Sequence, residues 1–374
     1  MFRPIRILHV LGALNRGGAE TMVMNLYRNI DREKVQFDFV IHTNEKCDFH
    51  DEIISLGGKI YSFPRYKGVN HFQYIKTWKK FFSYHSEYKI IHGHMRSTAS
   101  IYLSIAKGHG CFTIAHSHSI ESRGNIIERL VKNTLQIPLR YIPDYFFACS
   151  DEAGSWLFGE KTILKENYAK LNNSINISDF TFSKDKREET RILLGIKNEL
   201  LLGHVGSFTQ PKNHKFLIEI FFEIQQKNKD AKLLLIGSGE LQNTIIRQVE
   251  ELGISEKVLF LGSVPNVNDY MQAMDIFVFP SIFEGLGMAA LESQASGLRT
   301  IISDHLPEDI RLTKLISVLS LKEDAKSWSN TILKCNCTRL NVSSDLIKHG
   351  YDISETSTWI QKYYLSVSSK YAGE

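Results

Sequence analysis

Two glutamates, Glu284 and Glu292, stand eight positions apart at the start of an expected helix. Gly285, Leu286 and Gly287 form a short loop between them. Glycine lets a ligand approach the backbone closely, and the first N–H groups of a helix are unpaired and bind phosphate well. A carboxylate just before such a loop suits sugar hydroxyls, and one further along the helix suits a ribose. The segment therefore predicts a site for a sugar carried on a phosphate.

The run 283–292 (FEGLGMAALE) resembles the E-x7-E signature of retaining glycosyltransferases of family 4. An expected buried strand precedes the run, and Gly297 is a natural end for the helix that follows it. The resemblance covers nearly the whole chain. It implies the GT-B fold, in which two doubly wound, Rossmann-like α/β domains face a central cleft. It also implies that Glu284 hydrogen-bonds the sugar of a nucleotide-sugar donor and that Glu292 hydrogen-bonds its ribose.

The run 203–214 (GHVGSFTQPKNH) resembles a family segment in which an arginine and a lysine neutralise the donor diphosphate. Lys212 matches the lysine, but Ser207 stands where the arginine is usual. The missing guanidinium removes a charge-assisted contact of the kind worth about 1.5–3 kcal/mol. Lys215 and Arg16 are candidate replacement cations.

Two further turns suit a nucleotide. Gly237 opens the run GSGE between an expected strand and helix, and Val264 lies in LGSVPN, which resembles the family segment whose backbone reads a uracil edge. Simple strand-to-helix turns are the alternative interpretation of each. The implied donor is a UDP-hexose. No metal and no other cofactor are expected, because helix amides and Lys212 would stabilise the leaving diphosphate.

Gly17 and Gly18 follow the first expected strand and open a helix. Such a pair makes a backbone nest that favours anions, and in the resembled family this loop lies near the donor phosphates and the acceptor. A tight turn that requires glycine is the alternative. The run is not G-x-G-x-x-G, so a nicotinamide-dependent enzyme loses its main support.

Histidines end two neighbouring expected strands: His92 and His94 end one, and His116 and His118 end the next. Histidines two apart can share zinc, but no acidic or cysteine partner with metal spacing accompanies them, so a metal site is not favoured. In the resembled family a histidine here lies over the donor sugar, and TIAHSHS (113–119) aligns best through His116, with His118 second. His116 is expected to stabilise the positive charge that develops at the anomeric carbon. Arg96, His94 and His118 are expected on the acceptor side.

The sequence around these residues alternates short apolar runs with amphipathic segments, twice over, which is typical of parallel sheets with helices on both faces. We expect an N-terminal acceptor-side domain at 1–180 and a nucleotide-sugar-binding domain at 181–350. A C-terminal helix at 351–374 should pack back on the first domain. The polar and charged stretch 172–191 is interpreted as the inter-domain connection. Strands are expected at 5–11, 37–41, 60–63, 90–92, 112–115, 145–148, 200–205, 232–236, 258–261, 276–279 and 300–302, and helices at 19–29, 72–85, 98–107, 126–141, 216–226, 241–252 and 288–295.

Composition limits the classes of protein. A chain of 374 residues with 43% apolar residues fits two globular domains, and its five scattered cysteines favour reduced thiols. No run approaches the ~20 apolar residues of a membrane span, and the start lacks the apolar stretch of a signal peptide, so a cytoplasmic protein is expected. No nucleic-acid partner is expected.

A peripheral contact with the inner face of the plasma membrane is a further expectation. Residues 1–180 hold 23 Lys and Arg against 17 Asp and Glu, which fits an anionic acceptor, a lipid surface or ordinary scatter. Aromatic residues alternate with lysines at helical spacing between 74 and 85, and both interfacial binding and core packing produce such a stripe. The aromatic residues are Tyr74, Trp78, Phe81, Phe82 and His85, and the lysines are Lys76, Lys79 and Lys80.

The resemblance also implies a function. The runs 15–39, 92–99 and 115–119 are similar to glycosyltransferases of bacterial exopolysaccharide and capsule clusters. By that resemblance the chain moves a hexose from a UDP-sugar to a lipid-linked oligosaccharide and retains the anomeric configuration. Three alternatives stay open: a UDP-sugar epimerase of the same fold, a partner protein that binds a nucleotide sugar with little turnover (suggested by Ser207), and a nicotinamide-dependent enzyme.

Overall fold

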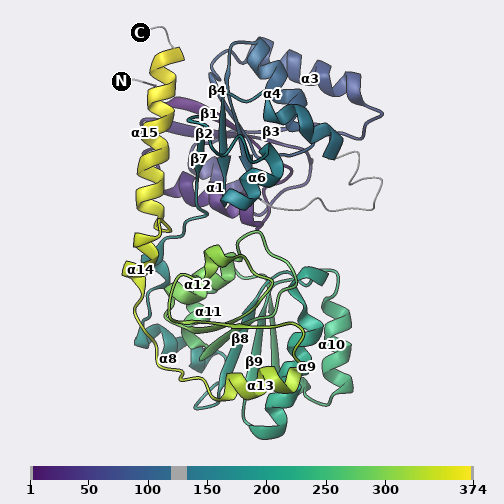
Figure 1. Cartoon of the computed structure of the whole chain (residues 1–374), viewed down its shortest axis with the longest axis vertical. Helices are drawn as coiled ribbons and strands as arrows, with labels where there is room; N and C mark the ends of the chain where they lie inside the picture. The colour runs from purple at the N-terminus through teal and green to yellow at the C-terminus, as the bar shows by residue number, and fades with distance from the viewer. Residues whose placement is uncertain (1–2, 119–132, 372–374) are drawn as a thin grey trace. The chain divides into compact units, whose positions relative to one another are not determined.

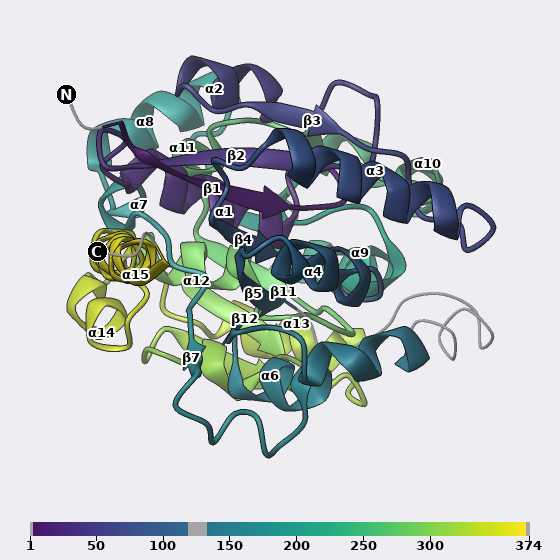
Figure 2. The same ribbon diagram turned by 90° about the horizontal axis from the view of Figure 1, so that it is seen from above.

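The computed structural model describes residues 3–118 and 133–371. The chain forms two compact units: unit 1 comprises Met1–Ile175 and Gly350–Glu374, and unit 2 comprises Asn176–His349. Each unit is built on one parallel sheet with helices packed against it (Figures 1 and 2). The sequence-based expectation of two parallel α/β domains is therefore confirmed.

In unit 1, consecutive strand residues belong to hydrophobic clusters on opposite faces of the sheet. Ile7 packs in the cluster of α1 (Gly18–Asn29), α2 (His50–Ser55) and α15 (Ile353–Tyr371). Leu8 packs in the cluster of α3 (His71–Tyr84), α4 (Ala99–Gly108) and α6 (Asp151–Phe158). The strands are β1 (Ile5–Val10), β2 (Val35–Ile41), β3 (Ile60–Ser62), β4 (Ile90–Gly93), β5 (Phe112–Ser117), β6 (Tyr145–Ala148) and β7 (Tyr168–Lys170). Their order is β3-β2-β1-β4-β5-β6-β7.

Unit 2 repeats this architecture with a shorter sheet. Its strands are β8 (Leu201–Val205), β9 (Lys232–Ile236), β10 (Val258–Gly262), β11 (Ile276–Phe279), β12 (Arg299–Ser303) and β13 (Ile316–Leu319), in the order β10-β9-β8-β11-β12-β13. Its helices are α7 (Ile177–Phe180), α8 (Lys184–Leu193), α9 (His214–Lys227), α10 (Gln242–Glu251), α11 (Val267–Ala273), α12 (Met288–Ala295), α13 (Ala325–Leu333) and α14 (Ser343–Lys348). Trp328 of α13 and Phe221 of α9 are fully buried in the core of this unit.

In both sheets the strand order reverses beside the first strand of the unit. β4 pairs with β1 in unit 1, and β11 pairs with β8 in unit 2, all in parallel. Doubly wound sheets bind ligands outside the carboxyl ends of the strands at such a reversal, because the loops there diverge. The loops after β1, β4, β8 and β11 are therefore the places where functional side chains are expected.

The charged run 184–191 is helix α8 of unit 2, so its interpretation as a connection between domains is wrong. Ser183 caps the helix by accepting a hydrogen bond from the amide of Lys186. On its inner face Arg187 and Arg191 contact Asp275, with N···O distances of 2.5 and 3.3 Å. The buried residues of this helix are Thr190 and Arg191 rather than apolar residues, which is why no apolar periodicity revealed it. Of the helix expected at 126–141, residues 126–132 lie outside the described residues, residues 133–136 are helical as expected, and Ile137–Arg140 form a 3₁₀ turn.

Helix α15 carries the end of the chain back across unit 1 (Figure 1). It contacts α1 and strands β2 and β4. Its buried residues Ile360, Tyr364 and Val367 join the same cluster as Phe37 of β2. This packing places a tyrosine from the C-terminal helix beside the first and fourth strands of the sheet.

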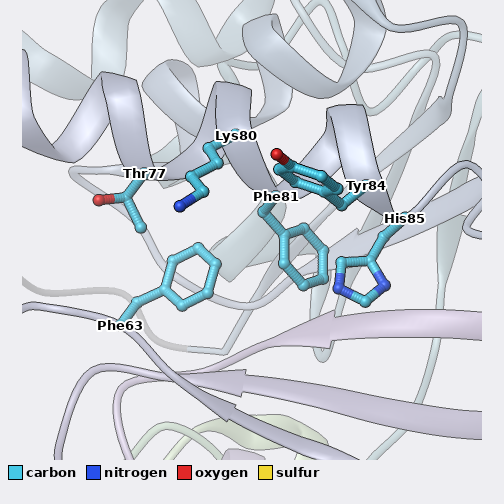
Figure 3. A pocket seen from close by; sticks show the side chains of 6 residues that line it. All are labelled: Phe63, Thr77, Lys80, Phe81, Tyr84 and His85. Carbon is cyan, nitrogen blue, oxygen red and sulfur yellow. The ribbon is translucent and has the colours of Figure 1, made fainter.

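The aromatic stripe of α3 belongs to the core of unit 1, so of the two interpretations left open for these rings, core packing is confirmed. Tyr74, Trp78, Phe81 and Phe82 are all buried there, and Trp78 stacks on Tyr102 of α4. Phe63, Phe81 and Lys80 line part of a shallow depression of about 340 Å³ beside the helix (Figure 3). No helix among the described residues is long and apolar enough to cross a membrane.

Candidate functional site

A largely buried ion pair joins the loops that follow β8 and β11. Lys212 Nζ donates to Oε1 of Glu284 at 2.5 Å, and the two side chains are 20% and 10% exposed. The loops lie side by side because the amide of Ile282 donates to the carbonyl of Pro211 at 2.7 Å. The structure thus brings two of the sequence-predicted donor residues together at the strand-order reversal of unit 2.

The chain turns at Asn213, directly after Lys212. Asn213 has a left-handed backbone (φ 56°, ψ 40°), which asparagine adopts more readily than most residues, and its amide Nδ2 donates to the carbonyl of Pro280 at 3.0 Å. The turn separates the 3₁₀ segment Gln210–Lys212 from α9. It therefore holds Lys212 against the loop that carries Glu284.

Helix α12 begins at Met288, four residues after Glu284, and has no side-chain cap. Its N-cap is Gly287, whose φ of 90° disfavours any residue with a Cβ; an added Cβ would also lie 3.3 Å from Leu306. Gly285 is half-buried and Leu286 is buried in the same loop. Because no side chain caps the first turn, its N–H groups are available to an anionic ligand.

Glu292 lies on the second turn of α12 and is partly buried. Burial raises the pKa of its carboxyl from 4.5 to about 7, and the nearby charge of Lys212 opposes that rise. The carboxyl is therefore partly protonated near neutral pH and can either donate or accept a hydrogen bond. Lys212 thus influences Glu284 through an ion pair and Glu292 through its charge.

The remaining predicted donor residues lie on neighbouring loops of unit 2. Gly237 has φ 136°, and a Cβ there would lie 2.1 Å from the carbonyl of Gly206, so the loops after β8 and β9 can touch only through glycine. Val264 is half-buried after β10. Ser207 is exposed, and its hydroxyl lies 3.3 Å from that of Thr209. Among the described residues, no lysine or arginine hydrogen-bonds to the hydroxyl of Ser207.

Two buried histidines that the sequence analysis did not single out lie behind Lys212. His214 stacks on Phe208 with ring centroids 4.1 Å apart, and His204 Nδ1 lies 2.9 Å from the carbonyl oxygen of Val278. Burial and the charge of Lys212 lower the pKa of His214 to about 4. Both rings are therefore neutral at physiological pH and add no positive charge to the site. His204 lies within β8 and His214 begins α9, and their place in the run GHVGSFTQPKNH was the available signal.

In unit 1, five histidines gather at the carboxyl ends of β1, β4 and β5. His9 Nδ1 lies 2.9 Å from His94 Nε2, and His94 Nδ1 lies 2.8 Å from His118 Nε2. His92 Nε2 lies 3.2 Å from His116 Nδ1. The structure therefore brings the predicted His94, His116 and His118 together. His9 was missed, although it directly opposes His92 in the pairing of β1 with β4.

The five rings differ in access but not in charge. His116 is buried, whereas His118 is partly exposed and stacks on His116 with centroids 4.0 Å apart. Burial lowers the pKa of His9 and His118 to about 3 and that of His92, His94 and His116 well below 6.5, so all are neutral at physiological pH. Ring nitrogens of His9, His92 and His94, and of His94, His116 and His118, lie within 4.8 Å of one another, which is close enough for three ligands of one metal ion.

The other predicted residues of unit 1 are Gly17 and Gly18, which follow β1 in the sequence, and Arg96, which follows β4. Gly17 is the N-cap of α1, and the carboxylate of Glu20 reaches back over it, 2.3 Å from where a Cβ would stand. This carboxylate already occupies part of the anion-friendly helix start, and burial raises its pKa. Gly18 is exposed. The guanidinium of Arg96 lies 5.4 Å from the ring centroid of Trp156.

Comparison with known proteins agrees with this geometry. The family described as Glycosyltransferase Family 4 matches residues 16–161, and Glycosyl transferases group 1 matches residues 185–309. A protein of Bacillus subtilis (strain 168) named "Putative glycosyltransferase EpsF" is 33% identical over 359 residues, which cover 94% of each chain. The capsular polysaccharide biosynthesis glycosyltransferase CapH of Staphylococcus aureus is 24% identical and covers 97% of this chain and 99% of its own.

Two more distant matches are a sequence relative and a solved structure. A UDP-Gal:alpha-D-GlcNAc-diphosphoundecaprenol alpha-1,3-galactosyltransferase of Escherichia coli is 24% identical over 58% of each chain. The crystal structure of Anabaena Alr3699/HepE in complex with UDP and glucose superposes with a TM-score of 0.72 at 16% identity, covering 99% of this chain and 98% of that one. At that identity the superposition establishes a shared fold.

Proposed function

The chain belongs to glycosyltransferase family 4, and we propose that it transfers a hexose from a UDP-sugar to a lipid-linked oligosaccharide, with retention of configuration, in capsule or exopolysaccharide synthesis. The observation that carries the proposal is the Lys212–Glu284 pair beside Glu292 at the carboxyl edge of the unit 2 sheet. Two relatives support the substrate classes: one is named for capsular polysaccharide and one for UDP-Gal and a diphosphoundecaprenol acceptor.

In this proposal the residues of unit 2 divide the donor between them. Lys212 and the uncapped start of α12 bind the diphosphate and stabilise it as it leaves, so turnover needs no metal ion. Glu284 accepts hydrogen bonds from the sugar hydroxyls. Glu292 hydrogen-bonds the ribose, which suits a carboxyl that is partly protonated near pH 7. Gly237 and Val264 line the path to the base.

Unit 1 supplies the acceptor side. His116 is proposed to contact the transferred hexose, and His94, His118 and Arg96 to contact the acceptor. The partial exposure of His118 and the burial of His116 make His118 the more accessible ring of the pair. Gly17 and Gly18 stay candidate contacts for an anionic group, although Glu20 competes for the same helix start.

A peripheral membrane contact fits the exposed end of α3. Val69 and Phe72 are 95% and 86% exposed, and the chain holds no acidic residue between Glu52 and Glu87. Exposed apolar side chains beside lysines favour an anionic lipid surface. Flotation with phosphatidylglycerol vesicles should recover the chain, and the change of Val69 and Phe72 to serine should abolish recovery. Leu164→Ser, at an equally exposed apolar residue of unit 1, is the matched control.

The proposed function is tested by offering the chain UDP-hexoses and an undecaprenyl-diphosphate-linked sugar, after chelation of metals. We expect release of UDP and an extended lipid whose new anomeric proton, by NMR, has the configuration of the donor. Glu284→Gln should bind UDP normally and lose most turnover. Ser207 favours one second candidate, a nucleotide-sugar-binding partner with little turnover, for which UDP-sugar would bind without UDP release. Conversion of the sugar without UDP release would instead indicate an epimerase.

A further inference from the structure

A hydrogen-bonded chain in unit 1 links the C-terminal helix to His116. Oη of Tyr364, on α15, lies 2.7 Å from Nδ1 of His92. Nε2 of His92 lies 3.2 Å from Nδ1 of His116. Within residues 3–118 and 133–371, the second nitrogen of His116, Nε2, is buried and has no hydrogen-bond partner. The chain therefore ends at a buried ring nitrogen that has no partner among the described residues.

The phenol of Tyr364 decides the direction of this chain. Burial raises the pKa of Tyr364 well above 10, so it keeps its proton, and among the described residues its hydroxyl has only His92 Nδ1 as a partner. If Nδ1 did not accept, a buried O–H would lack an acceptor, which is costly. A neutral imidazole carries one N–H, so His92 must donate from Nε2 to Nδ1 of His116. The proton of His116 is then on Nε2.

A parallel chain provides an internal comparison. It runs from His9 through His94 to His118, with contacts of 2.9 and 2.8 Å. Its outer nitrogens, His9 Nε2 and His118 Nδ1, have no partner in the described part of the chain. Among the described residues, no group that must donate is hydrogen-bonded to His9 or His118. The tautomers of these three histidines are therefore not fixed in the way that Tyr364 fixes the tautomer of His92.

We propose that Tyr364, acting through His92, is a positioning residue that holds His116 as an Nε2–H donor. In this state His116 donates a hydrogen bond to an oxygen of its ligand and cannot accept a proton at Nε2. That the oxygen belongs to the transferred hexose rests on the proposed function. With these protons in place, neither group of three histidines offers three free ring nitrogens to a metal ion. In the first group both nitrogens of His92 are hydrogen-bonded, and in the second group Nε2 of His116 carries a proton.

Nitrogen-15 NMR of the histidine-labelled full chain tests the proposal without any substrate, because protonated and unprotonated ring nitrogens have well-separated shifts. In the unaltered protein His116 should carry its proton on Nε2. In Tyr364→Phe the ratio of its tautomers should move at least about fivefold toward Nδ1–H, since the anchoring donor is gone. His94 and His118 should not change. Tyr363→Phe is the matched control, because the buried hydroxyl of Tyr363 on the same helix has no partner among the described residues.

A His116 that carries its proton on Nδ1 in the unaltered protein overturns the proposal, whether or not Tyr364→Phe folds. So does a Tyr364→Phe spectrum identical to that of Tyr363→Phe. Kinetics then tests the link to function: Tyr364→Phe should lower kcat about 2- to 10-fold, the worth of one neutral hydrogen bond, with KM for the donor nearly constant. If the NMR shift occurs and kcat is unchanged, Tyr364 still positions His116, and the role of His116 in transfer is rejected.

Discussion

Lys212→Met tests the candidate donor site at the residue that connects its parts. The change nearly keeps the length of the side chain but removes the ammonium group that donates to Glu284 at 2.5 Å. It also removes the positive charge that lowers the pKa of Glu292. Glu284, with its side chain only 10% exposed, loses the only cation with which it forms an ion pair among the described residues.

The expected loss of stability follows from this burial. Removing one partner of a fully buried ion pair costs about 3–5 kcal/mol, because the other charge is left unpaired. Because Lys212 is 20% exposed, water screens part of the effect, and we expect a loss of about 1–3 kcal/mol in the free energy of unfolding. The double variant Lys212→Met, Glu284→Gln should recover most of that loss. Urea denaturation of the single and double variants measures the coupling.

Donor binding should respond differently. Lys212→Met loses a charged hydrogen bond to the diphosphate, which is worth about 1.5–3 kcal/mol. The Kd of UDP should therefore rise roughly 10- to 150-fold. The double variant should stay weak, because neutralising Glu284 does not restore a cation. Calorimetric titration with UDP measures both. A Lys212→Met protein with unchanged stability and unchanged affinity for UDP would refute the assignment of this site.

Three further predictions concern single residues. The pKa of Glu292 is about 7 in the folded chain and 4.5 ordinarily, so the folded state binds this proton more tightly than the unfolded state. The free energy of unfolding, relative to that of Glu292→Gln, should therefore fall as the pH rises from 4.5 to about 7. A difference between the two proteins that does not depend on pH in urea denaturation would contradict this. Ser207→Arg should tighten UDP binding by about 1–2 kcal/mol and make it more salt-sensitive. Calorimetry that finds unchanged or weaker binding rejects a vacant cation site. His116→Ala should reduce the rate far more than donor affinity; if His118→Ala is instead the inactive form, the accessible ring is the catalytic one.

Local sequence was sufficient for the parts of this protein that depend on neighbouring residues. The run 276–295 predicted strand, glycine loop and helix, and the structure has β11, Gly287 at the N-cap and α12 at those places. A short apolar run predicts a strand, and a glycine followed by apolar residues at helical spacing predicts the start of a helix. Few distant contacts are needed to specify such elements. The resemblance to a family, carried by this run, likewise needed no tertiary structure.

The tertiary structure decided what depends on distant contacts. A stripe of rings and lysines on α3 is compatible with membrane or core, and only packing against α4 showed that Trp78 is buried. Helix α8 was missed because its inner face is arginine paired with Asp275. Likewise, Tyr364 stands 272 positions from His92, so only α15 folding back over the sheet could join them. Burial and pKa are sums over such distant neighbours, and for that reason the sequence specified the elements while the fold specified the environment of their side chains.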